Sequence, residues 1–189
     1  LFDDFISLIY PKICLGCNHS LLKHEQCICT VCQFHIPKTN HFQKKENNLQ
    51  KLLWGKVQLN HAAALYEFVK DSPLQKMIHA LKYEENQEVG IYLGKQIGYE
   101  IEDCEFLKNI DYILPVPLHP KKEKLRGYNQ SMCIAKGIQE ILDIEVDTNI
   151  LTRTVDTESQ TKKNKYSRWE NVGEVFQIGN EETPKYKHV

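Results

Sequence analysis

The feature of this sequence that most restricts its fold is a pair of C-x-x-C motifs near the N-terminus. Cys14 and Cys17 form the first pair, and Cys29 and Cys32 follow after eleven intervening residues. Each two-residue spacer lets two sulfurs reach one tetrahedral metal from a tight turn, which Gly16 is expected to permit. The pattern predicts a four-thiolate zinc site. Such a zinc is structural, because four thiolates leave no coordination position open.

Other interpretations of these cysteines stay open. Structural disulfides are one, although they belong mainly to secreted chains, and a redox C-x-x-C is another, although such a pair usually stands alone. Three groups between the motifs could replace a ligand: Cys27, His19 and His24. Cys104 and Cys133 lie in apolar segments, where buried thiols are expected.

The composition excludes a fibrous repeat protein and a mostly disordered chain. The chain has 189 residues, 41% hydrophobic and 26% charged, which is the balance of a soluble globular protein. Its 24 basic and 25 acidic side chains nearly cancel, so any anion site must be a local patch rather than a basic coat. No apolar run approaches the ~20 residues of a membrane span, and no membrane insertion is expected.

Beyond residue 60, strand-like and helix-like patterns alternate, which indicates an α/β domain. Residues 62–68 are predicted to form a strand. Ser72 and Pro73 then predict a helix start, a hydroxyl cap followed by proline in the first turn. A second helix runs from about Glu88, and glycines at every fourth position on it predict close packing against a neighbour. These glycines are Gly90, Gly94 and Gly98.

The segment PVPLHPKKEKLRGYNQ, residues 115–130, carries most of the chemical information. A short strand is expected at residues 111–116, and Asn129 can cap the helix that follows. Four cations fall within six residues: Lys121, Lys122, Lys124 and Arg126. A strand, a cationic loop and a helix N-terminus are how an α/β fold usually binds phosphate. The alternative is a solvated lysine-rich loop.

Arginine is used sparingly in this chain. There are 21 lysines but only three arginines, Arg126, Arg153 and Arg168, so arginine is placed where a planar, bidentate group matters. Residues 151–171 are polar and hydroxyl-rich, and so long a loop favours a mobile, functional segment. Residues 144–151 and 172–178 flank it and predict a hairpin-like pair.

Together these segments resemble the ComF family. The resemblance rests on the four-cysteine module, on ALYEF and a helix ending in HALKY, on DYILPVPLHPKKEKLRGYNQ and on LTRTVDTESQTKKNKYSRWENVGEVF. That family is similar to type I phosphoribosyltransferases preceded by a zinc ribbon. The resemblance implies a zinc-ribbon module at residues 1–40, a linker at 41–60 and a phosphoribosyltransferase-like α/β domain at 61–189, incomplete at its C-terminus.

The resemblance also implies residue roles, without assigning a catalytic residue. It implies a pyrophosphate- or phosphate-binding site at Pro117, Leu118, His119, Lys121, Lys124, Arg126, Asn129 and Gln130. It implies a flexible lid containing Arg153, Gln160, Lys162, Lys163, Lys165, Arg168 and Asn171.

Family members are associated with DNA uptake in natural competence. The resemblance therefore implies a cytoplasmic protein that binds single-stranded DNA or a phosphorylated small molecule and works with a helicase partner. In the DNA-binding interpretation, Tyr128, Tyr166 and Trp169 are candidates to stack bases. A zinc-dependent protein-docking scaffold is an alternative.

An active phosphoribosyltransferase that uses magnesium and phosphoribosyl pyrophosphate (PRPP) is a further alternative for the full-length protein. Such enzymes hold the sugar phosphate and magnesium through two adjacent acidic residues, followed by a loop rich in Thr and Gly. The only adjacent aspartates here are Asp3 and Asp4, ahead of the cysteine motifs. We therefore expect that the chain is cut before this loop and is inactive as it stands.

Overall fold

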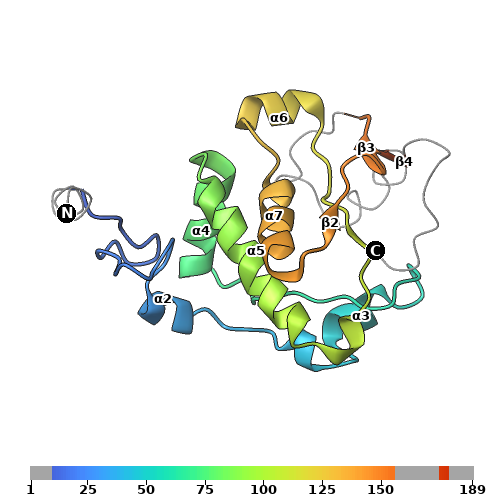
Figure 1. Cartoon of the computed structure of the whole chain (residues 1–189), viewed down its shortest axis with the longest axis horizontal. Coiled ribbons are helices and arrows are strands. Elements are labelled where there is room, and N and C mark those ends of the chain that lie inside the picture. Colours follow the sequence, from blue (N-terminus) through green and yellow to red (C-terminus); the bar gives the residue numbers. More distant parts are fainter. Residues whose placement is uncertain (1–9, 156–174, 179–189) are drawn as a thin grey trace.

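The computed structural model of the protein describes residues 10–155 and 175–178. Helices predominate along these residues, and the four short strands all follow residue 110 (Figure 1). The elements are α2 (Thr30–Phe34), η1 (His41–Gln43), α3 (Asn48–Leu53), α4 (Pro73–Tyr83), α5 (Gln87–Glu102), η2 (Glu105–Leu107), β1 (Tyr112–Ile113), α6 (Pro120–Arg126), α7 (Gln130–Leu142), β2 (Glu145–Val146), β3 (Leu151–Arg153) and β4 (Phe176–Ile178).

The helices expected after residue 70 are confirmed. Ser72 caps α4, because its hydroxyl oxygen accepts from the backbone amide of Gln75 at 3.3 Å. The Asn129 side chain caps α7 in the same way, accepting from the amide of Ser131 at 3.0 Å. Both caps satisfy amide groups that the first turn of a helix leaves unpaired.

Helix α5 packs along α7, and glycines lie at their contact. A Cβ atom on Gly94 would lie 2.8 Å from Cα of Gly137, closer than real Cβ atoms approach other heavy atoms. One on Gly98 would lie 2.8 Å from Cβ of Ile141. The close packing predicted from the glycine spacing on α5 is therefore confirmed, and its partner is α7.

Two small sheets are present. Strands β1 and β2 pair in parallel, with Tyr112 opposite Glu145, and the crossover between them contains α6 and α7. Strands β3 and β4 pair antiparallel, with Arg153 opposite Phe176. The strand expected at residues 111–116 is thus shorter than predicted. The hairpin-like pair expected between residues 144–151 and 172–178 is confirmed only in part: Leu151 pairs with Ile178, but Glu145 and Val146 pair with β1 instead. Residues 172–174 lie outside the described residues.

The strand predicted at residues 62–68 is wrong. Residues 62–68, expected to form a strand, make only an isolated bridge, between Lys38 and Tyr66. The backbone pairs with residues 37–39 on either side of that bridge: the Glu67 amide donates to Pro37 O and the Thr39 amide to Leu65 O. Pro37 has no N–H to donate back to Glu67, so the ladder cannot extend on that side of the bridge.

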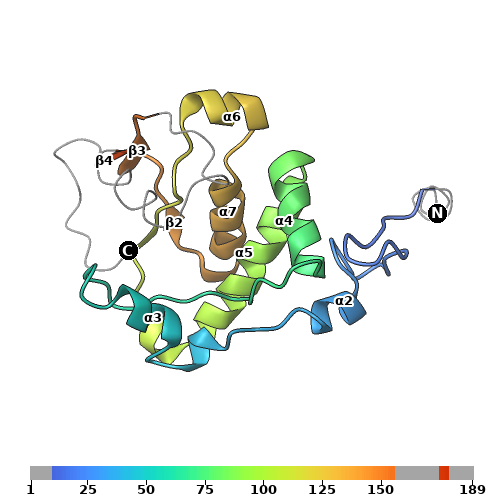
Figure 2. The ribbon, with the colours of Figure 1, turned by 180° about the vertical axis from the view of Figure 1, so that it is seen from behind.

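The cysteine motifs share a hydrophobic core with α4 and α5. Cys14 and Cys32 are buried in one cluster with Met77 of α4 and Val89 of α5. Lys76 Nζ also donates to the carbonyl oxygen of Gly16. Figures 1 and 2 show the motifs at the α4 end of the molecule and the strands β3 and β4 at the other end. Within the described residues, no helix has the length and apolarity to cross a membrane.

Candidate functional site

The four predicted cysteine ligands come together in the structure. The sulfur atoms of Cys14, Cys17, Cys29 and Cys32 all lie within 4.8 Å of one another. The sulfurs of Cys17 and Cys29 are 3.7 Å apart. A tetrahedral zinc with Zn–S bonds of about 2.3 Å places its sulfurs about 3.8 Å from one another. The cluster therefore has the size that a four-thiolate zinc requires.

Backbone amides surround the sulfurs. The amides of Gly16 and Cys29 donate to Cys14 Sγ at 3.3 and 3.2 Å, and the amide of Cys32 donates to Cys29 Sγ at 3.5 Å. A hydrogen bond from the backbone of His19 lowers the pKa of Cys17 to about 6, whereas burial raises the pKa of Cys32. Such N–H···S bonds favour thiolates, which are the form that binds metal.

The alternative ligands are not part of this cluster. Among the residues that the structure describes, the potential metal-binding group contains the four cysteines and neither His19, His24 nor Cys27. Cys27 is buried nearby, and desolvation raises its pKa to about 11. All seven cysteines are free thiols, and Cys104 and Cys133 are buried as expected.

Gly16 has a different role from the one expected. The left-handed residue of the first turn is Asn18, with φ 62°. Gly16 is required for space instead, since a Cβ atom there would lie 2.8 Å from Cys32 Sγ and 3.1 Å from Cβ of Pro73. A glycine is needed where the first C-x-x-C loop meets both the second motif and α4.

The predicted phosphate-binding residues lie around the start of α7. Arg126 Nη1 donates to Gln130 Oε1 at 2.9 Å. Asn129 Nδ2 donates to the carbonyl oxygen of Val116 at 3.1 Å, which ties the start of α7 to the segment containing Pro117 and Leu118. The structure thus brings Arg126, Asn129 and Gln130 together with the residues that follow β1.

The cationic stretch is a helix, α6, and not the loop that the prolines and charges predicted. His119 caps it, with Nδ1 accepting from the Lys121 amide at 3.3 Å, and Pro120 occupies the first turn. Gly127, with φ 78°, ends it. A proline at the first turn favours a helix rather than opposing one, which explains the difference. Lys121 and Lys124 are exposed on α6, and Lys122 is half-buried.

Tyr128 is a core residue and not a base-stacking platform. Its side chain is only 9% exposed, and its hydroxyl donates to the carbonyl oxygen of Leu81 in the last turn of α4. Burial raises its pKa. The Tyr128 ring therefore joins residues 115–130 to α4.

The predicted lid is described only at its first residue. Arg153 lies in β3, with its guanidinium carbon 5.6 Å from the centre of the Phe176 ring and Nε donating to Val155 O. The other predicted lid residues, and the candidate stacking residues Tyr166 and Trp169, lie outside the described residues: Gln160, Lys162, Lys163, Lys165, Arg168 and Asn171. That the lid covers Arg126 stays a prediction.

Sequence reasoning also missed a large groove beside α3. It is lined by Lys45, residues 54–61, residues 106–108 and Ile110, from two parts of the chain nearly fifty residues apart. The apolar triplet Leu52, Leu53 and Trp54 was the only sequence indication near it.

Known proteins similar to this chain were found. The DNA utilization protein YhgH of Escherichia coli K12 is 27% identical over 187 residues, covering 90% of this chain and 79% of that protein. The Shigella flexneri protein of the same name matches to the same extent. Competence protein F of Haemophilus influenzae is 23% identical over 175 residues, covering 87% and 76%. The resemblance to the ComF family is confirmed.

The match to the Escherichia coli DNA utilization protein leaves only a tenth of this chain outside it, so it includes residues 115–130, which lie well inside the chain. No family model and no solved structure matches the chain. A transferase activity, magnesium and PRPP stay predictions for this protein.

Proposed function

We propose that this protein supports the uptake or use of DNA, and that it does so by binding a phosphate-bearing ligand on a phosphoribosyltransferase-like fold. The relatives named DNA utilization protein and Competence protein F support the biological role. The β1–α6–α7–β2 crossover, in which parallel strands flank a helical connection, supports the fold.

The observation that carries the proposal is the hydrogen bond between Arg126 and Gln130 at the first turn of α7. It holds the guanidinium beside the N-terminus of a 13-residue helix, where the helix dipole attracts anions. The guanidinium is a bidentate phosphate donor, and the exposed Lys121 and Lys124 add positive charge from α6. A phosphate of single-stranded DNA or of a small molecule is the proposed occupant.

The proposed zinc has a structural role in this function. Cys14, Cys17, Cys29 and Cys32 would hold it, and a closed four-thiolate site supplies folding energy rather than chemistry. Because the same cluster contacts α4 and α5, the metal would also fix the cysteine motifs against the helical body.

The test is a binding titration with a fluorescein-labelled oligothymidylate and, separately, with inorganic pyrophosphate. Arg126→Ala is expected to weaken binding of at least one of the two by roughly tenfold or more, the value of a charge-assisted hydrogen bond. Lys82→Ala, which removes an exposed lysine of α4, is the matched control. Equal affinities of Arg126→Ala and the wild-type protein for both probes would count against the proposal.

Protein docking through the cysteine module is a second candidate function. Val31 and Phe34 of α2 are 65% and 88% exposed, although both are large and apolar. The double variant Val31→Ser, Phe34→Ser should keep its zinc and its oligonucleotide affinity. If docking is the function, this variant lowers DNA uptake in the source organism; unchanged uptake would exclude it.

A further inference from the structure

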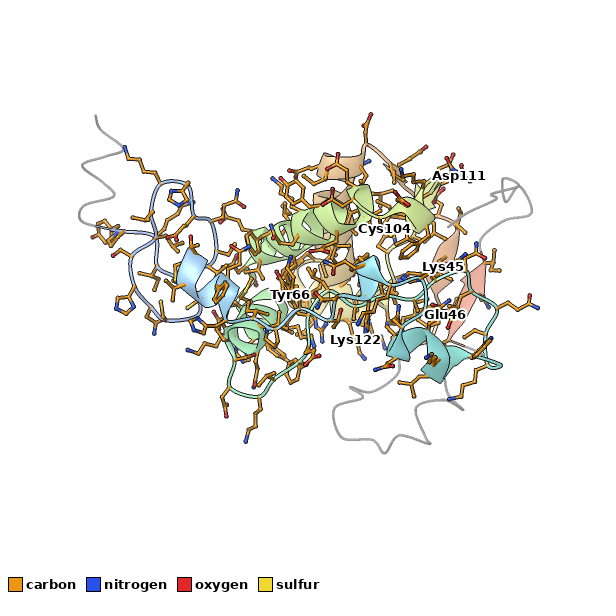
Figure 3. All side chains as sticks on the ribbon, turned by 90° about the horizontal axis from the view of Figure 1, so that it is seen from below. Lys45, Glu46, Tyr66, Cys104, Asp111 and Lys122 are labelled. Atoms are coloured by element: carbon orange, nitrogen blue, oxygen red, sulfur yellow. The ribbon has the colours of Figure 1, made fainter. Side chains whose placement is uncertain are left out.

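The groove beside α3 is too large for a typical small molecule. Its volume is about 1260 Å³, above the ~300–1,000 Å³ of most small-molecule sites. One wall is the segment after α3, residues 54–61, and the other is η2 with the residues that follow it. Figure 3 looks onto this face, with Lys45 and Glu46 beside α3 and Asp111 toward the edge. We call it the α3 groove.

The described residues that line the α3 groove carry charge of one sign. Lys45, Lys56 and Lys108 are among them, and none of these lining residues is acidic. The acids nearest to it in sequence are Glu105, which precedes Phe106 in η2, Glu46, which lines a smaller cavity that shares Trp54 with the groove, and Asp111, which follows Ile110. In a chain whose net charge is −1, three lysines among the described lining residues make this groove a candidate site for a polyanion.

The exposed indole of Trp54 also lines the α3 groove. Trp54 is the residue after α3, and its side chain is 80% exposed. Gly55 follows with φ 73°, and no heavy atom beyond its chain neighbours lies within 4 Å of the position that a Cβ atom on it would take. The exposed indole leaves a large aromatic face open to a ligand, and burial of such a ring contributes strongly to binding.

Two further rings line the groove, one from each wall. His61 and Phe106 are edge-to-face, with ring centres 4.8 Å apart. His61 Nε2 is buried and has no hydrogen-bond partner among the described residues. Burial lowers the pKa of His61, so the imidazole is neutral at neutral pH and the positive charge of the groove comes from its lysines.

We propose that the α3 groove binds single-stranded DNA, with Trp54 stacking on a base and Lys45, Lys56 and Lys108 contacting phosphates. Exposed aromatic rings within a cationic groove are the combination that binds single strands without sequence readout. Duplex DNA fits less well, because its bases are already stacked and their faces are covered. The proposal rests on the proposed function only in taking DNA as the relevant polyanion.

The α3 groove is separate from α6 and Arg126. Figures 1 and 2 both show α6 at one end of the body and α3 at the opposite end. Single-stranded DNA in the α3 groove would therefore make a contact in addition to any phosphate bound by Arg126.

The experiment measures the fluorescence anisotropy of a labelled oligothymidylate of about 15 nucleotides, a length within the range of single-strand sites. Trp54→Ala is expected to weaken binding roughly tenfold, and Trp54→Phe, which keeps a ring, to restore most of it. Lys45→Glu with Lys108→Glu should weaken binding and reduce the salt slope by about 1.4, since each single-strand phosphate contact contributes about 0.7.

Two exposed lysines elsewhere provide the matched control, Lys12→Glu with Lys82→Glu. Circular dichroism and zinc content show whether each variant is folded. Wild-type affinity in Trp54→Ala and in the Lys45/Lys108 variant would overturn the inference. If Arg126→Ala alone loses the oligonucleotide, the proposed function stands and the α3 groove does not.

An acidic peptide is the competing occupant. Poly-glutamate is therefore added to the preformed oligonucleotide complex. If it displaces the strand at concentrations similar to those of unlabelled oligothymidylate, and Trp54→Ala weakens both equally, the groove recognises acidic chains in general and the proposal fails. Displacement only at much higher concentration supports it.

Discussion

Gly94 of α5 and Gly137 of α7 face each other at the point where the two helices touch. A Cβ atom on either residue would lie within 2.9 Å of the other's Cα and directly against a backbone carbonyl, that of Ile134 or Ile91. The backbones are therefore in contact, and no side chain separates them. This contact sets the position of α7, and with it the position of Arg126 and Gln130.

Gly94→Ala is expected to destabilise the protein by about 1 kcal/mol or more. Alanine would gain about 1 kcal/mol of helix propensity, but overpacking against backbone atoms that cannot rotate away costs about 1–3 kcal/mol or more. Thermal or urea unfolding measures the difference. Glu88→Ala, on the exposed side of α5, is the control and should change stability by less than about 0.5 kcal/mol. A Gly94→Ala protein as stable as wild type would mean that the helices are further apart than described.

Cys32→Ser is expected to lower bound zinc well below one ion per chain and to lower the melting temperature of the whole body. The sulfur is one of four ligands and also part of the core shared with α4 and α5. Zinc content by mass spectrometry and a thermal scan measure both effects. Cys104→Ser changes an equally buried thiol outside the cluster and should keep its zinc. Retention of a full zinc equivalent by Cys32→Ser would contradict the assigned ligand set.

Gly16→Ala should weaken zinc retention roughly tenfold without removing a ligand. The added methyl group would overlap Cys32 Sγ, and overpacking of this kind costs about 1–3 kcal/mol. Competition with a chromophoric chelator measures the affinity. Ser20→Ala, an exposed position in the same loop, is expected to leave it unchanged. Equal affinities of the two variants would show that the loop can move away.

Tyr128→Phe should reduce the free energy of unfolding by about 1 kcal/mol, because it removes the hydrogen bond to the last turn of α4. Its effect on oligonucleotide affinity should be small, since the ring is buried and cannot stack on a base. Tyr83→Phe, on an exposed tyrosine of α4, is the control for stability. A large loss of DNA affinity in Tyr128→Phe at full stability would restore the stacking role.

Local sequence patterns determined the elements whose stabilising groups are close together in the chain. The C-x-x-C pairs specify the four-thiol cluster, because a two-residue spacer alone brings two sulfurs to one point. Ser72 with Pro73, and Asn129, specify helix starts through bonds within one turn. The glycine spacing on α5 predicted a close helix contact, but nothing in the spacing identified Gly137 as the partner.

Only the tertiary structure decided the features that depend on distant residues. Residues 62–68 have a strand-like composition, yet their pairing ends at Pro37, about thirty residues earlier, which has no amide hydrogen to offer. Tyr128 became a core residue because α4 supplies an unpaired carbonyl at Leu81. The α3 groove is lined by residues 54–61 and by residues between 106 and 110. Local periodicity cannot predict which loops face each other, because the packing of the helices between them decides it.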